Sequence, residues 1–285
     1  MLPNFLICGA QKAGTNSLYY YLEQHPEISL SEKKEVHFFC WDFIYNKGIR
    51  WYEKHFISDS KVIGEATPYY MFHPKVPKRI YETLPNSKLI FILRNPVSRA
   101  YSHYWHEVSS GWEDKSFEEA ISIEDSRIKK SQLHHLHYSY LNRGKYAKQI
   151  QRFLDYFPKS QIMIIKTNDL YEKRNETLKK IFDFLKINNN INIKNFELQN
   201  VGMVPKIRIL QKFAVKNNPF IVPFPYNKIK TKSKISEFIG ESLKYSICKI
   251  NLKRGYTKIK KETKLILNSY FEDYEEELSL LLKKW

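Results

Sequence analysis

The stretch GAQKAGTNSL, residues 9–18, decides how this chain is expected to fold. It follows the short apolar run FLIC, residues 5–8, and leads into an aromatic stretch with helical character. A strand, a glycine loop and a helix in this order form a phosphate cradle, because backbone N–H groups at the helix N-terminus point at the anion. The loop keeps the glycine spacing of the nucleotide-triphosphate loop G-x-x-x-x-G-K-[ST], but Thr15 stands at the lysine position and Lys12 lies inside the loop.

The loop offers several kinds of donor to an anion. Backbone N–H groups at the start of the helix add to side-chain hydroxyl and amide groups, and Lys12 adds a positive charge beside the phosphate. The predicted phosphate-binding residues are Lys12, Ala13, Gly14, Thr15, Asn16 and Ser17.

The second informative stretch is LRNPVSRAYSHY, residues 93–104. Its first two residues are the end of the apolar run KLIFILR, residues 88–94. Arg94 falls at the C-terminal end of this predicted strand, where open α/β sheets bind their ligands. Ser102 lies two turns into the following helix, so both side chains could reach one phosphate, with Arg94 as a bidentate donor. A Mg-dependent NTPase needs an acidic residue at the end of such a strand, so the arginine argues against metal-assisted phosphoryl transfer.

Length and composition indicate one soluble globular domain, residues 1–285. A hydrophobic share of 42% and a charged share of 27% are ordinary for such a chain, and no apolar run approaches the ~20 residues of a membrane-spanning helix. No signal peptide is expected before the first strand, and the three cysteines have no disulfide or zinc spacing. We therefore expect a cytoplasmic protein.

Positive charge is concentrated toward the C-terminus. The chain has a formal net charge of +17, and residues 206–264 contribute sixteen Lys/Arg and three Glu, a net of +13. Such a region favours an anionic partner, such as a nucleotide, an acidic glycan or an anionic membrane, and we expect no nucleic-acid partner. The alternative is compositional drift, since lysines outnumber arginines 37 to 10, as in chains from A/T-rich genomes.

Apolar runs alternate with helical signals along the first two thirds of the chain. That alternation predicts an α/β fold with a central parallel β-sheet flanked by helices, because strands covered on both faces are apolar throughout. The pattern weakens after residue 188, where a polar loop and a proline-broken apolar patch at 220–226 precede a basic run. Strands are expected at residues 4–8, 61–65, 88–94 and 161–166, and helices at 15–24, 74–84, 96–110, 117–127, 140–157 and 262–282.

These motifs resemble those of the sulfotransferases that use 3′-phosphoadenosine-5′-phosphosulfate (PAPS). Residues 9–18 look like the 5′-phosphosulfate loop of that family, and residues 93–104 look like its 3′-phosphate motif. KKEVHFF, residues 33–39, resembles the segment that carries the catalytic carboxylate in heparan-type glycan sulfotransferases. LKRGYTK, residues 252–258, resembles the basic glycine loop that closes over the nucleotide.

The resemblance implies a role for each motif. Glu35 is expected to be the general base, His37 to orient it or touch the acceptor, and Lys12 to neutralise charge on the bridging oxygen. PAPS is then the cofactor and 3′-phosphoadenosine 5′-phosphate (PAP) the product, with no metal required, and the histidine run at 134–137 is not expected to bind one. The residues expected to clamp the 3′-phosphate from the opposite side are Lys253, Arg254 and Gly255.

The resemblance also implies a P-loop-like sulfotransferase fold, with transfer to a hydroxyl group, or less readily an amine, of a carbohydrate or glycoconjugate. Acceptor specificity is expected in residues 188–250, which match no motif of the family. Heparan-type enzymes usually carry a lysine at the position of Ala66, so the alanine argues against heparan-like acceptors. A lipid or small-molecule alcohol is the alternative acceptor, and the apolar patch at 220–226 leaves peripheral membrane contact open.

Two rival functions come from other classes. A nucleotide-dependent kinase would show Mg-dependent ATP turnover, and the displaced loop lysine and Arg94 argue against it. A non-catalytic polyanion-binding protein would use the basic region 206–264 and would be indifferent to Glu35→Gln. The sequence indicates neither the sulfation position nor the oligomeric state.

Overall fold

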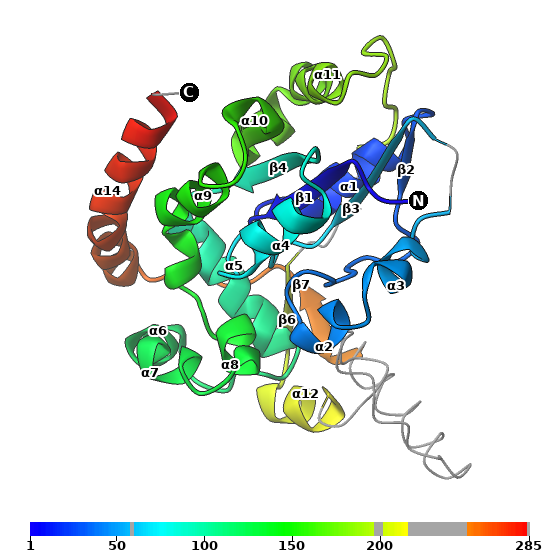
Figure 1. The fold of residues 1–285 in the computed structure, drawn as a ribbon. Coiled ribbons are helices and arrows are strands. Elements are labelled where there is room, and N and C mark those ends of the chain that lie inside the picture. The colour runs from blue at the N-terminus through cyan, green and yellow to red at the C-terminus, as the bar shows by residue number, and fades with distance from the viewer. Residues whose placement is uncertain (58–59, 197–201, 216–249, 284–285) are drawn as a thin grey trace. The chain divides into compact units, whose positions relative to one another are not determined.

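A computed structural model describes residues 1–57, 60–196, 202–215 and 250–283 of the chain (Figure 1). The chain divides into two compact units. The expectation of a single domain stays a prediction. Among the described residues, none of the helices combines the length and the apolar character needed to cross a membrane. The first unit comprises Met1–Arg99, Lys145–Asn200 and Tyr270–Trp285, and the second comprises Ala100–Gly144 and Val201–Ser269.

A five-stranded parallel sheet forms the centre of the first unit, as predicted, in the order β2-β3-β1-β4-β5 (Figure 1). Four of its strands coincide with the predicted ones to within one residue at each end, whereas the short edge strand β2 was not predicted. Because all neighbours are parallel, the carboxyl ends of the strands meet at one edge, where α/β sheets bind ligands. The strands are β1 (Phe5–Gly9), β2 (Ile28–Leu30), β3 (Val62–Ala66), β4 (Lys88–Leu93) and β5 (Ile162–Lys166).

Close packing between β1 and β3 explains the glycine in the middle of β3. Every residue of these two strands is buried. Phe5 lies opposite Gly64 in the register, and a Cβ atom at Gly64 would lie 2.2 Å from the Phe5 ring. The glycine therefore leaves the space that the phenyl ring fills, and the two strands can lie directly side by side.

Helices flank the sheet (Figure 1), and the predicted helices at 15–24, 74–84, 96–110 and 262–282 are present to within two residues at each end. Pro77 lies in the first turn of α4 (Val76–Thr83), where its missing N–H leaves no helical bond unmade. The predicted helix at 140–157 is wrong at its start, because Asn142–Gly144 forms a separate 3-10 turn before α9 (Tyr146–Leu154). The unit also contains α1 (Thr15–Glu23), α2 (Asp42–Tyr45), α3 (Ile49–Glu53), α10 (Thr167–Glu172) and α11 (Arg174–Leu185), while α5 (Pro96–Ser109) and α14 (Lys261–Lys283) have residues in both units.

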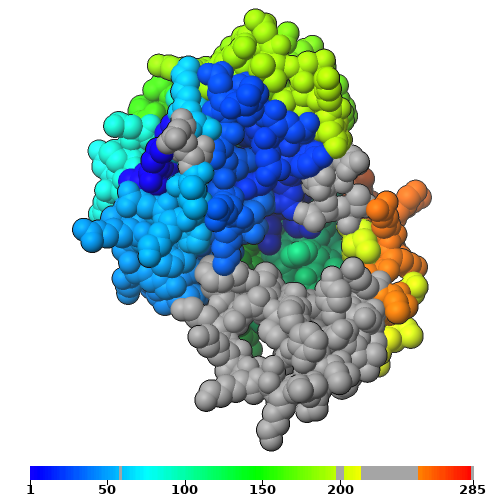
Figure 2. Space-filling view, turned by 90° about the vertical axis from the view of Figure 1, so that its right-hand side faces the viewer, coloured from blue at the N-terminus to red at the C-terminus, as the bar shows by residue number. Residues whose placement is uncertain are grey.

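The polar stretch after α11 is a loop, as predicted, and it packs against the end of α1. Figure 2 shows this segment in yellow-green beside the blue N-terminal residues. His25 Nε2 lies 2.8 Å from the Asn188 carbonyl oxygen, and Gln24 Nε2 donates to the Asn195 carbonyl oxygen at 2.9 Å. Most of the predicted acceptor-specificity region 188–250, including its apolar patch, lies outside the described residues.

Short helices and one small sheet make up the second unit. The predicted helix at 117–127 is instead two helices, because Ile123 leaves the helical conformation with φ −107° and ψ 8°. Ser116 caps the first of them, since its hydroxyl accepts from the Glu119 N–H while the Glu119 carboxylate accepts from the Ser116 N–H. The elements of this unit include α6 (Phe117–Ser122), α7 (Glu124–Ile128), α8 (Gln132–His137), α12 (Arg208–Val215) and the antiparallel strands β6 (Met203–Pro205) and β7 (Leu252–Arg254).

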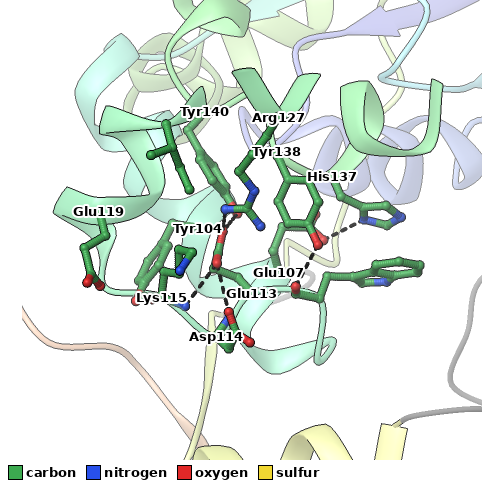
Figure 3. A network of polar contacts seen from close by, with 12 residues as sticks. Tyr104, Glu107, Glu113, Asp114, Lys115, Glu119, Arg127, His137, Tyr138 and Tyr140 are labelled. Carbon is green, nitrogen blue, oxygen red and sulfur yellow. Dashed lines mark hydrogen bonds and ion pairs between the residues drawn. The ribbon is translucent and has the colours of Figure 1, made fainter. Parts of the chain in front are cut away.

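A buried acid–histidine cluster ties α5 to α8 (Figure 3). Both carboxylate oxygens of the buried Glu107 accept hydrogen bonds, from His103 Nε2 at 3.1 Å and from His137 Nδ1 at 2.7 Å. The Trp112 ring stacks on His137 with centroids 3.9 Å apart. Burial by itself would raise the pKa of Glu107, but the charge of His137 and the hydrogen bonds from both histidines outweigh it and hold that pKa well below its ordinary value.

A second buried carboxylate, Glu113, lies in the turn that follows α5 (Figure 3). It accepts hydrogen bonds from the Tyr140 hydroxyl at 2.8 Å and from Arg127 Nη1 at 2.6 Å. The Arg127 guanidinium also lies over the Tyr138 ring, 3.4 Å from its centroid. Hydrogen bonds between charged partners are stronger than neutral ones, so this group connects α7 firmly to the turn after α5.

We expect Glu107→Gln to lower the free energy of unfolding at neutral pH by about 3–5 kcal/mol, the usual effect of removing one partner from a buried pair. The variant should also lose the part of the acid dependence of stability that Glu107 contributes. A carboxylate with a depressed pKa stabilises the folded state at pH values above 4.5, the ordinary pKa of a glutamate. That contribution disappears as the pH falls through the lower pKa of the folded state. Urea unfolding from neutral pH into the acid range measures both effects.

The matched control is Glu277→Gln, because Glu277 is an exposed residue of α14. It should unfold like the wild-type protein throughout. If the free energies of unfolding of the two variants depended on pH in the same way, Glu107 would not be the buried, ionised group described here.

Candidate active site

The loop between β1 and α1 turns through two left-handed residues. Lys12 has φ 67°, and Gly14, which caps α1, has φ 106°. A side chain at Gly14 would be strained by this backbone angle, and its Cβ would lie 3.0 Å from the Tyr171 hydroxyl. The first N–H groups of a helix have no acceptor within it, so the start of α1 offers donors to an anion. Ala13 differs from the other predicted backbone donors, because its N–H donates to the Ala10 carbonyl oxygen at 3.2 Å.

Two side chains that follow neighbouring strands hold the loop by its carbonyl oxygens. Arg94, directly after β4, donates from Nη1 to the Lys12 carbonyl oxygen at 3.0 Å. Thr167, directly after β5, donates from its hydroxyl to the Ala13 carbonyl oxygen at 2.7 Å. The Tyr146 hydroxyl donates in turn to the Arg94 carbonyl oxygen at 2.9 Å. The structure therefore brings Arg94 to the phosphate loop, and it adds Thr167, which no motif in the sequence indicates.

Lys34 connects the start of α1 to the segment that carries Glu35. Its Nζ donates to the Asn16 side-chain oxygen. Burial lowers the pKa of Lys34, although nearby carboxylates, Glu35 first among them, act in the opposite direction. Ser17 is buried, and its hydroxyl lies 3.3 Å from the Tyr171 hydroxyl. Two predicted phosphate-binding side chains thus have partners within the protein, and sequence reasoning missed the contact made by Lys34.

Glu35 and His37 contact each other, as the expectation that His37 orients Glu35 requires, and their catalytic roles stay predictions. His37 Nε2 lies 3.3 Å from Glu35 Oε2, and the Glu35 side chain is 32% exposed. His37 is buried, and its other ring nitrogen, Nδ1, lies 3.3 Å from Cys40 Sγ. Burial lowers the pKa of His37, and the Glu35 charge offsets this only in part, so the imidazole is neutral at neutral pH. A partly exposed carboxylate beside a neutral imidazole is chemically suited to general-base catalysis.

Aromatic packing fixes the backbone that carries this pair. Phe38 stacks on Tyr52 with ring centroids 4.4 Å apart, and Phe39 meets Tyr70 edge to face at 5.5 Å. All four side chains are buried, so apolar area contributes most to placing the segment. This packing maintains a left-handed φ of 59° at His37, a conformation that non-glycine residues seldom adopt without support from their surroundings.

A buried carboxylate, Glu65, lies at the end of β3 and is linked to the same segment. Burial raises the pKa of Glu65 to about 7, despite hydrogen bonds that lower it. The Thr67 hydroxyl accepts from the His37 N–H at 3.4 Å while donating to Glu65, so the buried acid helps to hold the His37 backbone. Its three donors are the hydroxyl groups of Tyr52 at 2.5 Å, Tyr70 at 2.8 Å and Thr67 at 3.0 Å.

The other predicted site residues belong to the second unit. Ser102 is buried on α5, whereas residues 253–255 are exposed at the end of β7. Within this unit the basic loop packs onto the helix that carries Ser102, since the Tyr256 ring lies parallel to the Trp105 ring with centroids 6.3 Å apart. The structure thus brings the two predicted 3′-phosphate elements together, and their contact with a nucleotide stays a prediction.

The histidine run at 134–137 lies on α8, where His137 is bound to Glu107. Within the part of the chain that the structure describes, no group of three or more His, Cys, Asp or Glu residues is arranged to hold a metal ion. Whether the chemistry requires a metal stays a prediction.

We expect Glu65→Gln to change how stability depends on pH. A buried acid with a raised pKa binds its proton more tightly when folded. Its contribution to stability is therefore complete below the ordinary value of 4.5 and declines as the pH rises to about 7. A shift of this size corresponds to roughly 3 kcal/mol, and the amide variant should not show the decline.

Chemical unfolding across this pH range measures the effect. The difference in stability between the variant and the wild-type protein isolates Glu65, because other acidic groups contribute equally to both. The stability of the variant relative to wild type should rise with pH. A difference that stays constant would mean that Glu65 titrates like an ordinary exposed acid.

Comparison with known proteins agrees with these features. The family model described as a sulfotransferase domain matches residues 2–217. A crystal structure of a sulfotransferase from Alicyclobacillus acidocaldarius is similar with a TM-score of 0.60 and 32% identity, covering 68% of this chain and 85% of that one.

Curated relatives are larger proteins. The human bifunctional heparan sulfate N-deacetylase/N-sulfotransferase 3 is 31% identical over 297 residues, which cover 99% of this chain and 30% of the relative. The human heparan sulfate glucosamine 3-O-sulfotransferase 5 is 31% identical over 192 residues, 65% of this chain and 54% of the relative. The membrane-associated sulfotransferase kil1 of Dictyostelium discoideum is 46% identical over 108 residues, 36% of this chain and 22% of the relative. The chain thus spans between 22% and 54% of the length of these relatives.

Proposed function

This chain belongs to the PAPS-dependent sulfotransferase family, and on that premise we propose that it transfers the sulfuryl group of PAPS to a hydroxyl group of a carbohydrate or glycoconjugate. One observation carries the proposal. The phosphate loop, Arg94 and the Glu35–His37 pair belong to one compact unit, and Lys34 joins the loop to the segment that carries the pair.

The residues present fit the donor nucleotide. A left-handed glycine before an open helix N-terminus suits the 5′-phosphosulfate, and Lys12 supplies positive charge there. A guanidinium has five N–H donors, so Arg94 can bind a phosphate while it holds the loop, and we assign it to the 3′-phosphate. The nucleotide-binding roles of Ser102 and residues 253–255 stay predictions. When bound, PAPS supplies an activated sulfuryl group whose departure leaves PAP.

Glu35 is the proposed general base. It accepts the proton of the acceptor hydroxyl, and a base in this role typically contributes ~10²–10⁴-fold to the rate. His37 Nε2 lies 3.3 Å from Glu35 Oε2, and a ring hydrogen on Nε2 would leave the second carboxylate oxygen for the incoming proton. Lys12 stabilises the negative charge that develops on the leaving phosphate, and it does so from a position fixed before the reaction.

The proposed acceptor class is supported by the two human relatives, whose names specify heparan sulfate and include an N-sulfotransferase and a glucosamine 3-O-sulfotransferase. These names support a sugar hydroxyl and, as a second choice, a sugar amine. Ala66, buried at the end of β3, brings no charge to an acidic sugar. Transfer to a lipid or small-molecule alcohol is the alternative that an acceptor screen would detect. Specificity in residues 188–250 and a cytoplasmic location stay predictions.

We expect Glu35→Gln to lower kcat by at least about a hundredfold, because the amide cannot accept the proton. The affinity for PAP should stay within a few-fold of wild type, since Glu35 is not assigned to the nucleotide. Transfer of labelled sulfate from PAPS to a panel of glycans, lipids and alcohols measures kcat. Calorimetric titration with PAP measures the affinity for the nucleotide. Glu32→Gln, an exposed neighbour, is the control. A joint loss of transfer and PAP affinity would assign Glu35 a structural role.

We expect Arg94→Ala to weaken PAP binding roughly ten- to hundredfold, because a hydrogen bond to a charged group is worth about 1.5–3 kcal/mol. Thr167→Val is the matched control, since it removes the other side-chain contact to the loop without removing a charge. Equal effects of the two variants would indicate that loop geometry, rather than the guanidinium, governs binding. Titration with ATP and Mg²⁺ belongs to the same experiment, and tighter binding than PAP would indicate a kinase.

A further inference from the structure

His37 is held on both sides of its imidazole ring. Nε2 lies 3.3 Å from Glu35 Oε2, and Nδ1 lies 3.3 Å from Cys40 Sγ. His37 and Cys40 are buried, while Glu35 is partly exposed. The roles assigned so far do not involve Cys40, yet its sulfur is in hydrogen-bond contact with the ring that holds the proposed base.

Only one placement of the ring hydrogen suits both contacts. A neutral imidazole carries one N–H, and its other nitrogen is an acceptor. A carboxylate can only accept, so a His37 that binds Glu35 carries its hydrogen on Nε2. Nδ1 then presents a lone pair to Cys40, and the contact is favourable only if the sulfur is the donor.

Cys40 can be that donor because it stays a thiol. Burial raises the pKa of Cys40 well above its ordinary value, and the charge of Glu35 raises it further. The S–H group has a second acceptor in reach, the His37 carbonyl oxygen at 3.5 Å. If the thiol donated there, Nδ1 would have to donate to sulfur, and the Nε2 lone pair would face the carboxylate of Glu35.

We propose that Cys40 is a positioning residue for the sulfuryl transfer: its S–H donates to His37 Nδ1 and so fixes the Nε2–H tautomer that holds Glu35. The inference rests on the proposed role of Glu35 as the base. The ring acts as a neutral donor to one carboxylate oxygen, and the other oxygen is left to accept the proton of the acceptor hydroxyl.

Nuclear magnetic resonance of the histidine ring nitrogens tests the tautomer without any donor or acceptor bound. The ¹⁵N shift distinguishes a protonated ring nitrogen from an unprotonated one, and His37→Gln identifies the signals. In the wild-type protein we expect the hydrogen on Nε2 alone. In Cys40→Ala we expect signals averaged between the two tautomers. Cys8→Ala is the matched control, because Cys8 is also a buried thiol but its sulfur lies 3.8 Å from the Leu6 carbonyl oxygen.

Kinetics tests the consequence for transfer. Cys40→Ala should lower kcat about two- to tenfold, which corresponds to the loss of a hydrogen bond worth about 0.5–1.5 kcal/mol. KM for the acceptor and the affinity for PAP should not change, because Cys40 is not assigned to either ligand. Cys40→Ser keeps a donor at this position and should recover most of the loss. Cys8→Ala and Cys8→Ser measure the effect of altering a buried thiol elsewhere.

Three results would overturn the inference: a wild-type His37 with its hydrogen on Nδ1, a kcat in Cys40→Ala no lower than in Cys8→Ala, or a Cys40→Ser as slow as Cys40→Ala. Failure of the proposed function looks different. In that case the wild-type protein would neither bind PAP nor transfer sulfate, while the ring-nitrogen shifts would still show whether Cys40 fixes the tautomer.

Discussion

The parallel backbone pairing of β1 with β3 on one side and β4 on the other is the constraint on which the rest of the structure depends. It brings three strand ends to one edge of the sheet, so the phosphate loop after β1 has the segment after β3 as one neighbour and Arg94 as the other. These three segments are far apart in the sequence. The hydrogen bond from Arg94 to the loop is therefore a consequence of strand order rather than of any local pattern.

The aromatic residues next to the sheet have two tasks at once. Their rings supply the apolar area that holds Phe38 and Phe39, while the hydroxyl groups of Tyr52 and Tyr70 supply hydrogen bonds to the buried Glu65. Burial of an acid is unfavourable, and these donors compensate for it only in part, since the pKa stays raised. The placement of the Glu35 segment and the ionisation of the acid linked to it are therefore coupled through the same side chains.

The elements that local sequence patterns predicted correctly are those whose formation depends mainly on neighbouring residues. Apolar runs predicted four strands, and the loop sequence predicted the start of α1, because both depend on neighbouring residues. The break at Ile123 carries no glycine or proline signal, and the three residues of β2 are too few for a pattern. Glu35, His37 and Arg94 were predicted through motifs. The contributions of Thr167 and Cys40 were not, because each depends on a partner that only the folded chain supplies.

A neutral His37 supports a general base better than a protonated one would. A protonated imidazole would bind Glu35 more tightly, because the attraction between opposite charges would add to the hydrogen bond. The same attraction would make the carboxylate a weaker base. Burial of His37 disfavours the charged ring and avoids this. A neutral ring, however, can donate to Glu35 only in one tautomer, and a thiol hydrogen at Nδ1 selects that tautomer without adding a charge to the site.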